Sequence, residues 1–333
     1  MSVPLAASTG ARYARIYSVG SAVPSLVLDN EHMCQFIDSS DEWIQQRTGI
    51  VERRWLGEGE TLETLCLDAA RQAIDRSGLA PSDIDGVLVA SVSRVVQTPA
   101  LAPWLAAQLG TADDPVAYDI SAACAGFCYG LAQAEALIRT GQARHVLLVA
   151  AETLSRLTDV HDRATAFLFA DGAGAVVVGP SEVNGIGPVV WGSDGSQADV
   201  IWQTADWLHA VDSGERPSLG MSGQAVFRWA TTQIAKAAKR CLDEAGIAPD
   251  QLDVFIPHQA NDRITDTMLR YLRLPSSVVV ARTIRHLGNT SGSSIPIAMD
   301  MLLQSGEAKS GQTALVIGFG AGLVYGGQVV TLP

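Results

Sequence analysis

The sequence predicts an α/β fold that is built from two similar halves. Short Val-rich runs without polar alternation recur along the chain, and such runs are typical of strands buried on both faces. Helical patterns rich in small residues separate these runs, and one helix–turn–strand pattern occurs twice. Because strands and helices alternate, we expect helices packed in layers on the faces of sheets.

Each predicted element follows from a local pattern. The apolar runs predict strands at 87–92, 116–120, 146–151, 175–178, 254–256, 278–281, 314–317 and 324–330. The stretches between them predict helices at 60–77, 99–109, 124–140, 223–245, 261–272 and 293–305. Between the halves, residues 179–219 are rich in Gly, Pro, Ser and Asp, which predicts a hairpin and an irregular excursion that faces a substrate.

The internal repeat divides the chain. Residues 69–85 closely resemble residues 237–253, an offset of 237 − 69 = 168, and both run from a helix through a glycine, a proline and an acidic turn into a strand. A second internal similarity aligns residues 121–124 with residues 291–294, which puts Ser294 in the place of Cys124. The predicted helices that follow these two segments end at an offset of 311 − 141 = 170. A chance similarity of amphipathic helices is the alternative. Because two similar segments occur in the same order, the sequence predicts an N-terminal half of 1–180 and a C-terminal half of 181–333.

Composition narrows the function classes. The chain has 333 residues, of which 47% are apolar and 17% charged, and this balance excludes disorder. The net charge of 23 − 35 = −12 argues against a nucleic-acid or membrane-surface partner. No apolar run approaches the roughly 18 residues of a membrane span, and the first residues lack the apolar stretch of a signal peptide. Five cysteines without a CxxC pair indicate free thiols, so we expect a cytoplasmic protein.

Cys124 is the candidate nucleophile. It stands between a predicted strand that ends near Ile120 and a helix of small residues, so it lies at a helix N-terminus. The N–H groups and dipole there favour a thiolate, and we expect the pKa of Cys124 to be lowered. The alternative is a buried structural cysteine, which is our interpretation of Cys128 one turn further on.

Three further segments carry candidate functional groups, at the ends of strands or in the turn before a helix. His258 follows a buried strand that stops at Pro257, at the sheet edge where α/β proteins gather ligands, although a core histidine is the alternative. Asn289 lies in a turn that alone predicts only a helix cap, but a two-fold arrangement of the halves would bring it to the same substrate carbonyl as His258. Residues 317–322 are glycine-rich without a P-loop lysine, which favours an oxyanion hole of backbone N–H groups.

With these motifs the chain resembles β-ketoacyl-acyl carrier protein synthase III of the thiolase superfamily, over nearly its whole length. The matching segments are 41–44, 47–50, 53–54, 123–127, 169–175, 257–261, 288–291 and 318–322. Overall, the sequence most resembles the actinobacterial, and especially the mycobacterial, members of this family. The resemblance implies a thiolase-like fold with α-β-α-β-α layers. It implies the nucleophile and coenzyme A contacts in the N-terminal half, and the histidine, the asparagine and the glycine-rich turn in the C-terminal half.

The resemblance implies a decarboxylative Claisen condensation that starts fatty acid or related polyketide synthesis. Cys124 would take an acyl group from acyl-CoA, and malonyl-acyl carrier protein would then lose CO2 and attack the thioester to give 3-oxoacyl-acyl carrier protein. His258 and Asn289 match the family residues that stabilise the enolate. The backbone N–H groups of Cys124 and Ala321 match the oxyanion hole, with Ala321 at a position that is usually glycine. The resemblance implies no metal or redox cofactor.

Other site residues match the family by position. The expected contacts to coenzyme A are an aromatic ring that stacks on adenine, a second one at the tunnel entrance and three basic side chains: Trp43, Phe227, Arg47, Arg163 and Arg263. An exposed arginine face and a core-anchoring tryptophan are the alternatives for these residues. The acyl carrier protein would dock on Arg228, Arg263 and Arg270, for which an ordinary solvated helix face is the alternative.

Thr98 bears on the acyl pocket. The family is homodimeric, and many members have a phenylalanine at this position that caps the acyl pocket of the partner subunit. The smaller Thr98 side chain predicts a deeper pocket. Two rival functions are a starter-unit synthase or acyltransferase of secondary metabolism, and a non-catalytic acyl-binding scaffold. Retention of Cys124, His258 and Asn289 together argues against pure acyl transfer and against a scaffold.

Overall fold

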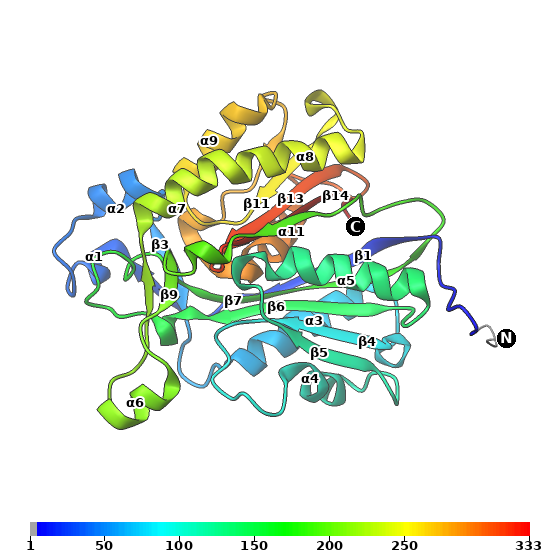
Figure 1. Ribbon diagram of the computed structural model, residues 1–333, viewed down its shortest axis with the longest axis horizontal. Coiled ribbons are helices and arrows are strands. Elements are labelled where there is room, and N and C mark those ends of the chain that lie inside the picture. Colours follow the sequence, from blue (N-terminus) through cyan, green and yellow to red (C-terminus); the bar gives the residue numbers. More distant parts are fainter. Residues whose placement is uncertain (1–4) are drawn as a thin grey trace.

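Two five-stranded sheets form the frame of the molecule (Figure 1). The structure is a computed structural model that describes residues 5–333. The first sheet has the order β1-β7-β6-β4-β5, from β1 (Tyr13–Ala22), β4 (Gly86–Ala90), β5 (Val116–Ile120), β6 (Val146–Thr153) and β7 (Asp171–Ser181). The second has the order β12-β11-β13-β14-β8, from β8 (Val190–Ser193), β11 (Val254–Pro257), β12 (Val279–Val280), β13 (Thr313–Gly320) and β14 (Val324–Thr331).

The two sheets share one topology. In the first, β4 pairs in parallel with β5 and β6, β7 is antiparallel to β6, and β1 is antiparallel to β7. In the second, β11 pairs in parallel with β12 and β13, β14 is antiparallel to β13, and β8 is antiparallel to β14. Chain order and strand direction therefore match strand for strand, and the predicted α/β fold of two duplicated halves is confirmed.

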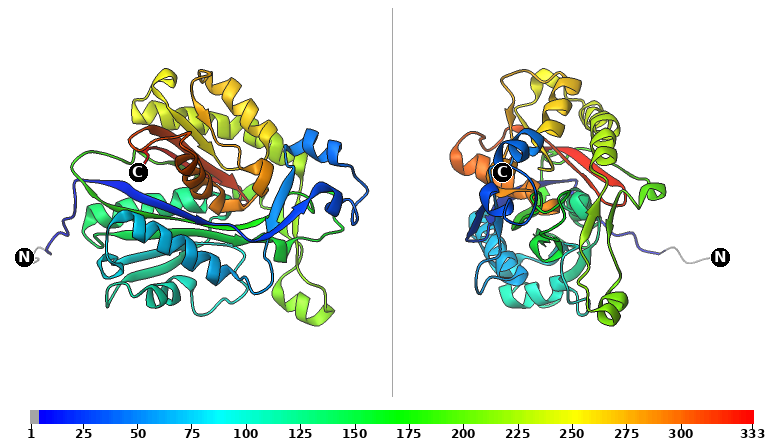
Figure 2. Two further views of the ribbon diagram at one scale, coloured as in Figure 1. Left: turned by 180° about the vertical axis from the view of Figure 1, so that it is seen from behind. Right: turned by 90° about the vertical axis from the view of Figure 1, so that its left-hand side faces the viewer.

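Helices complete five layers (Figures 1 and 2). On the outer face of the first sheet lie α3 (Leu62–Ser77) and α4 (Leu101–Leu109). The outer face of the second sheet carries α7 (Gly223–Trp229), a π-helical turn η5 (Ala230–Ile234), α8 (Ala235–Ala245) and α9 (Asp262–Leu272). Between the sheets lie α5 (Gly126–Thr140) and α11 (Ser294–Ser305), which contact both. This order is the predicted α-β-α-β-α layering.

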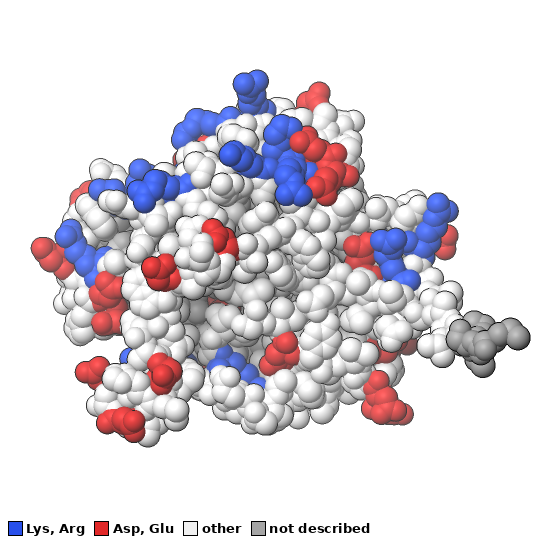
Figure 3. Space-filling model, viewed as in Figure 1, with Lys and Arg blue, Asp and Glu red and all other residues white. Residues whose placement is uncertain are grey.

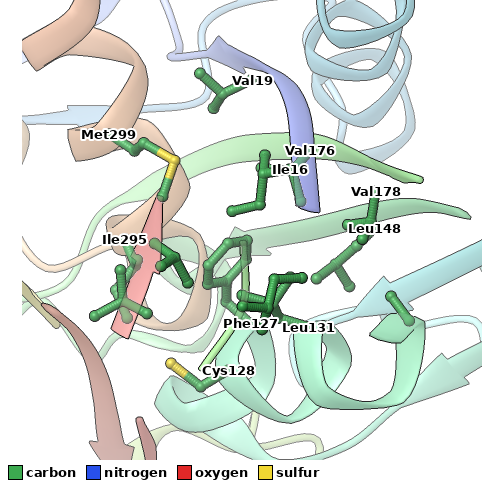
Figure 4. Close-up of a cluster of buried hydrophobic side chains, with 14 of the residues drawn as sticks. Ile16, Val19, Phe127, Cys128, Leu131, Leu148, Val176, Val178, Ile295 and Met299 are labelled. Carbon is green, nitrogen blue, oxygen red and sulfur yellow. The ribbon is translucent and has the colours of Figure 1, made fainter. Parts of the chain in front are cut away.

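The central layer holds the two helices against both sheets. Phe127 and Leu131 of α5 meet Ile295 and Met299 of α11 in one buried cluster with side chains from β1, β6 and β7 (Figure 4). Full burial of an aliphatic or aromatic side chain of this size stabilises a fold by about 1.5–3 kcal/mol. Because these side chains lock α5 to α11, they also fix the N-termini of the two helices relative to each other.

The structure confirms the repeat and corrects its register. α3 and α8 both end at a left-handed glycine, Gly78 (φ 75°) and Gly246 (φ 68°). Short 3-10 turns, η2 (Ala123–Ala125) and η7 (Ser291–Ser293), lead into α5 and α11. Each turn begins with a non-glycine residue of positive φ, Ala123 at 45° and Ser291 at 53°, at an offset of 291 − 123 = 168. The counterpart of Cys124 is therefore Gly292, and the prediction of Ser294 was wrong by two residues.

Several elements lack a clear signal in the sequence. β1 carries Arg15, Tyr17 and Ser18 among its apolar residues, so it does not form a continuous apolar run. The others are short: β2 (Leu26–Asp29), α1 (Asn30–Met33), α2 (Asp41–Thr48), β3 (Glu52–Trp55), η1 (Pro81–Asp83), η3 (Leu154–Leu157), η4 (Gly195–Gln197), β9 (Ile201–Gln203), α6 (Trp207–Ser213), β10 (Leu219–Met221), η6 (Pro249–Gln251) and α10 (Ile284–Leu287). Within the predicted excursion 179–219, β9 pairs with β10 as a ladder around α6.

Candidate active site

One cavity of about 650 Å³ brings most of the predicted site residues together. All three predicted catalytic side chains line it: Cys124, His258 and Asn289. The same cavity is lined by the predicted coenzyme A, oxyanion and docking residues Trp43, Arg47, Arg163, Phe227, Arg228, Arg263 and Ala321. Thr98 and Arg270 do not line it, and both are exposed at the surface. The β9–β10 ladder contributes Ile201, Leu219 and Met221 to the wall, as expected for a substrate-facing segment.

The sulfur of Cys124 sits beneath the turn between β13 and β14. A Cβ on Gly320 would lie 2.8 Å from Cys124 Sγ and 3.2 Å from its backbone nitrogen, so only glycine fits at this close approach. Ala321 follows directly and lines the cavity. The backbone of the glycine-rich turn therefore passes beside the Cys124 sulfur, where the sequence predicts an oxyanion hole.

Burial of the Cys124 thiol outweighs the groups that favour its ionisation. Desolvation raises the pKa of Cys124 to about 12, while a hydrogen bond from Ser291 Oγ, 3.3 Å from Sγ, and a backbone N–H act in the opposite direction. The negative charge of Glu152 raises it further. The prediction of a lowered pKa was wrong, because it counted the helix N-terminus and left out the apolar wall. The thiol is therefore protonated at neutral pH.

His258 is a buried, neutral imidazole at the end of β11. Its backbone N–H donates to Ile317 O (2.8 Å), and Nδ1 lies 2.8 Å from Ser294 Oγ. The ring of Phe319 packs edge-on at 5.3 Å between centroids. Desolvation lowers the pKa of His258 to about 3, against the effect of a hydrogen bond to the backbone of Ser291. The side chain is 3% exposed and uncharged at neutral pH, so it serves as a hydrogen-bonding group and not as a cation.

Asn289 is held on three sides by hydrogen bonds. Its N–H donates to Leu168 O (2.9 Å), and its carbonyl accepts from Ala170 N–H (2.9 Å), which forms a bridge between segments far apart in the chain. Its side-chain Oδ1 accepts from Ser291 N–H at 2.9 Å. Because the amide oxygen is engaged, the two N–H donors of Nδ2 are left for a group in the cavity.

Aromatic and guanidinium groups flank the cavity mouth. The guanidinium carbons of Arg47 and Arg163 lie 5.5 Å and 5.2 Å from the Trp43 ring centroid. Arg263 lies over Phe227 at 5.2 Å. Aromatic rings and guanidinium groups placed side by side suit a purine and its phosphates.

Ser291 and Glu152 are site residues to which the sequence analysis assigned no role. Ser291 is 2% exposed and contacts Cys124 Sγ, and Glu152 is 1% exposed beyond it. A signal was present for Glu152, because it is an acidic residue directly after an apolar strand, at the sheet edge where ligands gather. Ser291 lies inside a motif whose only assigned residue was Asn289.

Solved structures with this fold define the class of protein. The structure of a priming β-ketosynthase from the R1128 polyketide biosynthetic pathway matches with a TM-score of 0.96 and 44% identity, covering 99% of each chain. A 3-oxoacyl-(acyl carrier protein) synthase III from Pseudomonas aeruginosa matches with a TM-score of 0.89 and 37% identity, covering 97% of this chain and 99% of the other. The chain thus has the predicted thiolase-like fold of the acyl-condensing enzymes.

Sequence comparisons give the family. Two family models match, 3-oxoacyl-[acyl-carrier-protein] synthase III at residues 118–195 and its C-terminal domain at 242–332. A β-ketoacyl-[acyl-carrier-protein] synthase III of Streptomyces glaucescens is 54% identical over 97% of this chain and 98% of its own length. A mycobacterial β-ketoacyl-[acyl-carrier-protein] synthase III of Mycolicibacterium paratuberculosis is 49% identical over 99% and 98%. The chain belongs to the β-ketoacyl-acyl carrier protein synthase III family.

Membership confirms the predicted class of enzyme and the actinobacterial and mycobacterial character of the sequence. The chain is an acyltransferase that initiates fatty acid or related polyketide synthesis, with an acyl-CoA and an acyl carrier protein as its substrates. Among residues 5–333, no group of three His, Cys, Asp or Glu side chains is placed to bind a metal ion. None of the helices in this described range is long and apolar enough to span a membrane.

Proposed function

We propose that the chain condenses an acyl-CoA primer with malonyl-acyl carrier protein, with release of CO2, through Cys124, His258 and Asn289. The observation that carries this proposal is the meeting of these three side chains in one cavity with largely apolar walls. The N-terminal half (1–180) supplies the nucleophile, and the C-terminal half (181–333) supplies the histidine, the asparagine and the glycine-rich turn. No metal or redox cofactor enters the proposed reaction.

In the first half-reaction, Cys124 Sγ attacks the carbonyl carbon of acyl-CoA. A sulfur–carbon bond forms, the bond to the coenzyme A sulfur breaks, and the thiol proton ends on coenzyme A. The negative charge that develops on the carbonyl oxygen would be stabilised by the backbone N–H groups of Cys124 and Ala321. The close approach of Gly320 to Cys124 supports this assignment, because it brings both backbone segments to one place.

In the second half-reaction, the malonyl group loses CO2, and its thioester oxygen becomes an enolate. Asn289 Nδ2 and the imidazole of His258 would donate hydrogen bonds to that oxygen. Ser294 Oγ accepts from Gln259 N–H (3.2 Å), and its own proton is available to Nδ1 of His258 (2.8 Å). This arrangement favours the tautomer with its proton on Nε2, so a neutral His258 can donate. The enolate carbon then attacks the acyl-Cys124 thioester and frees the sulfur.

Coenzyme A would bind at the cavity mouth. The adenine would stack against Trp43, and the phosphates would meet Arg47 and Arg163, whose guanidinium groups now lie over that ring. Phe227 and Arg263 would flank the pantetheine on the opposite side of the entrance. An acyl chain would follow the apolar wall that includes Phe167, Leu219 and Met221 (all three line the cavity).

The acyl carrier protein would dock beside this mouth. Arg228 on α7 and Arg263 and Arg270 on α9 are exposed. Figure 3 shows basic side chains gathered over this part of the molecule, whereas acidic side chains lie around α6. Lys239 and Arg240 on α8 are already paired with Asp243 and Glu244, at 2.8 Å and 3.0 Å, so they contribute less net charge. An acidic carrier protein would thus meet a local positive patch on an acidic enzyme.

A homodimer in the cytoplasm is the proposed working form. β5 is an edge strand of the first sheet, and the loop before α4 exposes Val92, Val95 and Val96 by 39% to 49%. An unpaired edge beside exposed valines suits a second copy of the chain. Thr98 lies in the same loop, exposed and outside its own cavity, and would border the acyl pocket of the partner subunit.

A starter-unit role in polyketide synthesis is the second candidate. The match to a priming β-ketosynthase of the R1128 pathway, with a TM-score of 0.96, favours it. The intact catalytic set argues against a simple acyltransferase and against an acyl-binding scaffold, because neither needs donors for an enolate.

Substitution of the nucleophile tests the proposed function. Cys124→Ser should fail to form an acyl-enzyme with acyl-CoA, because a hydroxyl is a far weaker nucleophile at a site without a strong base. Intact mass spectrometry after incubation with acyl-CoA measures the adduct. Cys34→Ser, which removes another partly accessible thiol, is the matched control and should acylate like the wild type. Acylation of Cys124→Ser at the wild-type rate would overturn the assignment.

A further inference from the structure

Glu152 is a buried carboxyl group beside the nucleophile that the proposed condensation leaves unused. It lies in β6 near the carboxyl end of the strand, 1% exposed. Its surroundings are a serine-rich turn after β4 on one side and η7 on the other. Among the described residues no cation pairs with Glu152, so ionising a carboxyl group buried this deeply is costly, which makes it a candidate functional group.

The two oxygens of Glu152 have different partners. Oε2 accepts from Ser93 Oγ (2.5 Å), Ser93 N–H (3.1 Å), Val92 N–H (3.2 Å) and Ser91 Oγ (3.3 Å). Within the described part of the chain, Oε1 has only a longer contact to Val92 N–H (3.3 Å) and the hydroxyl of Ser291 at 3.4 Å. Oε2 is therefore anchored by several donors, and Oε1 is the oxygen on which a proton would be placed.

Ser291 connects this oxygen to the thiol. Its hydroxyl lies 3.3 Å from Cys124 Sγ and 3.4 Å from Glu152 Oε1. The hydroxyl has one proton and two acceptors, so it can donate to only one of them at a time. When it donates to Glu152, its lone pairs face the thiol S–H, and when it donates to sulfur, it stabilises a thiolate. Hydrogen bonds of catalytic groups are often long in an unliganded enzyme and shorten with substrate.

The backbone holds Ser291 in this bridging position. Its φ of 53° lies in the left-handed region, which is strained for serine. Its N–H is bound by Asn289 Oδ1 at 2.9 Å. At the matching position of the first half stands Ala123, also at positive φ, with no hydroxyl. The hydroxyl is therefore not needed to form the turn, which both halves make.

We propose that Ser291 and Glu152 form a proton relay that deprotonates Cys124 during acylation. The proposal rests on the proposed function, in which Cys124 is acylated. Ser291 is then a catalytic residue, because it touches the reacting sulfur. Glu152 is a positioning residue that acts through Ser291, since it orients that hydroxyl and holds the transferred proton.

The relay is balanced within one half-reaction. As Sγ attacks the acyl carbon, the thiol proton passes to Ser291 Oγ, and the Ser291 proton passes to Glu152 Oε1. When the tetrahedral intermediate collapses, the bond to coenzyme A breaks and leaves a coenzyme A thiolate. The proton returns from Glu152 through Ser291 to that thiolate. Glu152 is ionised before and after the half-reaction, and no further reactant is needed.

The acidity of Glu152 fits this cycle. Burial raises the pKa of Glu152 to about 7, against the serine and backbone donors that lower it. A carboxyl group whose pKa is near 7 can both accept and return a proton at physiological pH. The ionisable side chains on the elements around it include Cys124 on η2, Cys66 and Glu63 on α3, Asp171 on β7, Asp119 on β5 and Arg94 in the loop after β4, which pairs with Glu63 at 3.8 Å. Burial raises the pKa of Cys66, so this thiol stays protonated near neutral pH.

The pH dependence of single-turnover acylation by acyl-CoA tests the relay. In the wild type the rate should rise as Glu152 ionises near pH 7. Ser291→Ala and Glu152→Gln should each acylate roughly 10²-fold more slowly at that pH, the scale of losing a general base, and should lose the rise. The double variant should be no slower than either single variant, because both residues serve one pathway. Glu152→Asp should recover part of the rate and the pH dependence.

Ser293→Ala is the matched control. Ser293 is a buried hydroxyl in the same turn that donates to Thr290 O (2.8 Å) and not to Cys124, so its acylation profile should match the wild type. A wild-type profile in Ser291→Ala or Glu152→Gln would overturn the relay, as would additive losses in the double variant. Failure of the wild type to acylate at Cys124 would instead overturn the proposed function.

A measurement on the unmodified enzyme covers the case in which a variant does not fold. Because two protons move together in the relay, the acylation rate should fall in deuterium oxide, with a curved dependence on the deuterium fraction. A rate that does not change in deuterium oxide, or that depends linearly on the deuterium fraction, would contradict a two-proton relay.

Discussion

The two halves of this enzyme make the same turn in front of a central helix but place different chemistry there. In the N-terminal half, η2 carries Ala123 and Cys124 before α5, and in the C-terminal half, η7 carries Ser291 and Gly292 before α11. A Cβ on Gly292 would lie 3.1 Å from Ala123 O, so the two turns are in close contact. The first turn presents a thiol, and the second presents a hydroxyl toward that thiol.

This difference shows how a duplicated frame can hold an asymmetric site. The repeated sheet and the shared core of α5 and α11 fix the geometry of both turns. Ala123 and Ser291 share the same backbone conformation with different side chains, so the turn does not depend on the hydroxyl. We therefore expect substitution of the thiol in the first turn and substitution of His258 or Asn289 to affect different steps of the reaction, and the predictions below use that expectation.

The largest effect should come from the enolate donors of the C-terminal half. His258→Ala and Asn289→Ala should each cut CO2 release from malonyl-acyl carrier protein by roughly 10² or more, the loss expected for one positioned donor. Acyl-enzyme formation should remain measurable in both. His286→Ala, at an exposed histidine, is the control and should affect neither step. Normal CO2 release combined with failed acylation in His258→Ala or Asn289→Ala would reverse these roles.

A smaller, salt-dependent effect should come from the docking surface. Arg228→Glu together with Arg270→Glu should raise the apparent KM for malonyl-acyl carrier protein about tenfold at low salt, since steering by charge acts mainly on association. Acylation by acyl-CoA should change little, because its phosphates would meet Arg47 and Arg163. The test is kinetics of both half-reactions across ionic strength.

The control for the docking surface makes the same change of charge elsewhere. Arg12→Glu together with Arg144→Glu alters two exposed arginines outside the cavity lining and should leave the KM unchanged. Equal losses in both half-reactions of the docking variant, or no loss in either, would discard this surface.

The smallest effect should come from Thr98. Thr98→Phe should shift preference toward shorter acyl-CoA primers by filling the proposed deep pocket, with about 1–3 kcal/mol of discrimination. Competition between acyl-CoA primers of different length, measured by the mass of the acyl-enzyme, reports the preference. Thr98→Ser adds no volume and should keep the wild-type profile. An unchanged profile in Thr98→Phe would show that Thr98 does not border the pocket.

Local patterns in the sequence predict much of the frame, because buried strands and helix ends have strong signals. The Val-rich runs predict β4, β5, β6, β11, β13 and β14 within a few residues, and Gly78 and Gly246 end α3 and α8. The prediction is poorer where stability comes from tertiary contacts. β1 is interrupted by polar residues and forms by pairing with β7, a partner more than a hundred residues away.

Prediction of the site from the sequence is limited in the same way, because part of it depends on tertiary contacts. Cys124, His258 and Asn289 stand in recognisable motifs, so the sequence predicts them as candidates. The pKa of the Cys124 thiol depends on the wall around it, which is assembled from several segments and cannot be seen in the local motif. Glu152 and Ser291 are 139 residues apart, and only the fold shows that they contact.

The central claim is that acylation of Cys124 and decarboxylation at His258 and Asn289 are separable steps, and CO2 release from malonyl-acyl carrier protein by Cys124→Ala tests it most directly. This variant lacks the nucleophile but keeps His258 and Asn289. We expect no acyl-enzyme and a continued, measurable release of CO2, which the further substitution His258→Ala should suppress. Loss of CO2 release in Cys124→Ala to the level of that double variant would contradict the claim, because decarboxylation would then depend on the N-terminal nucleophile.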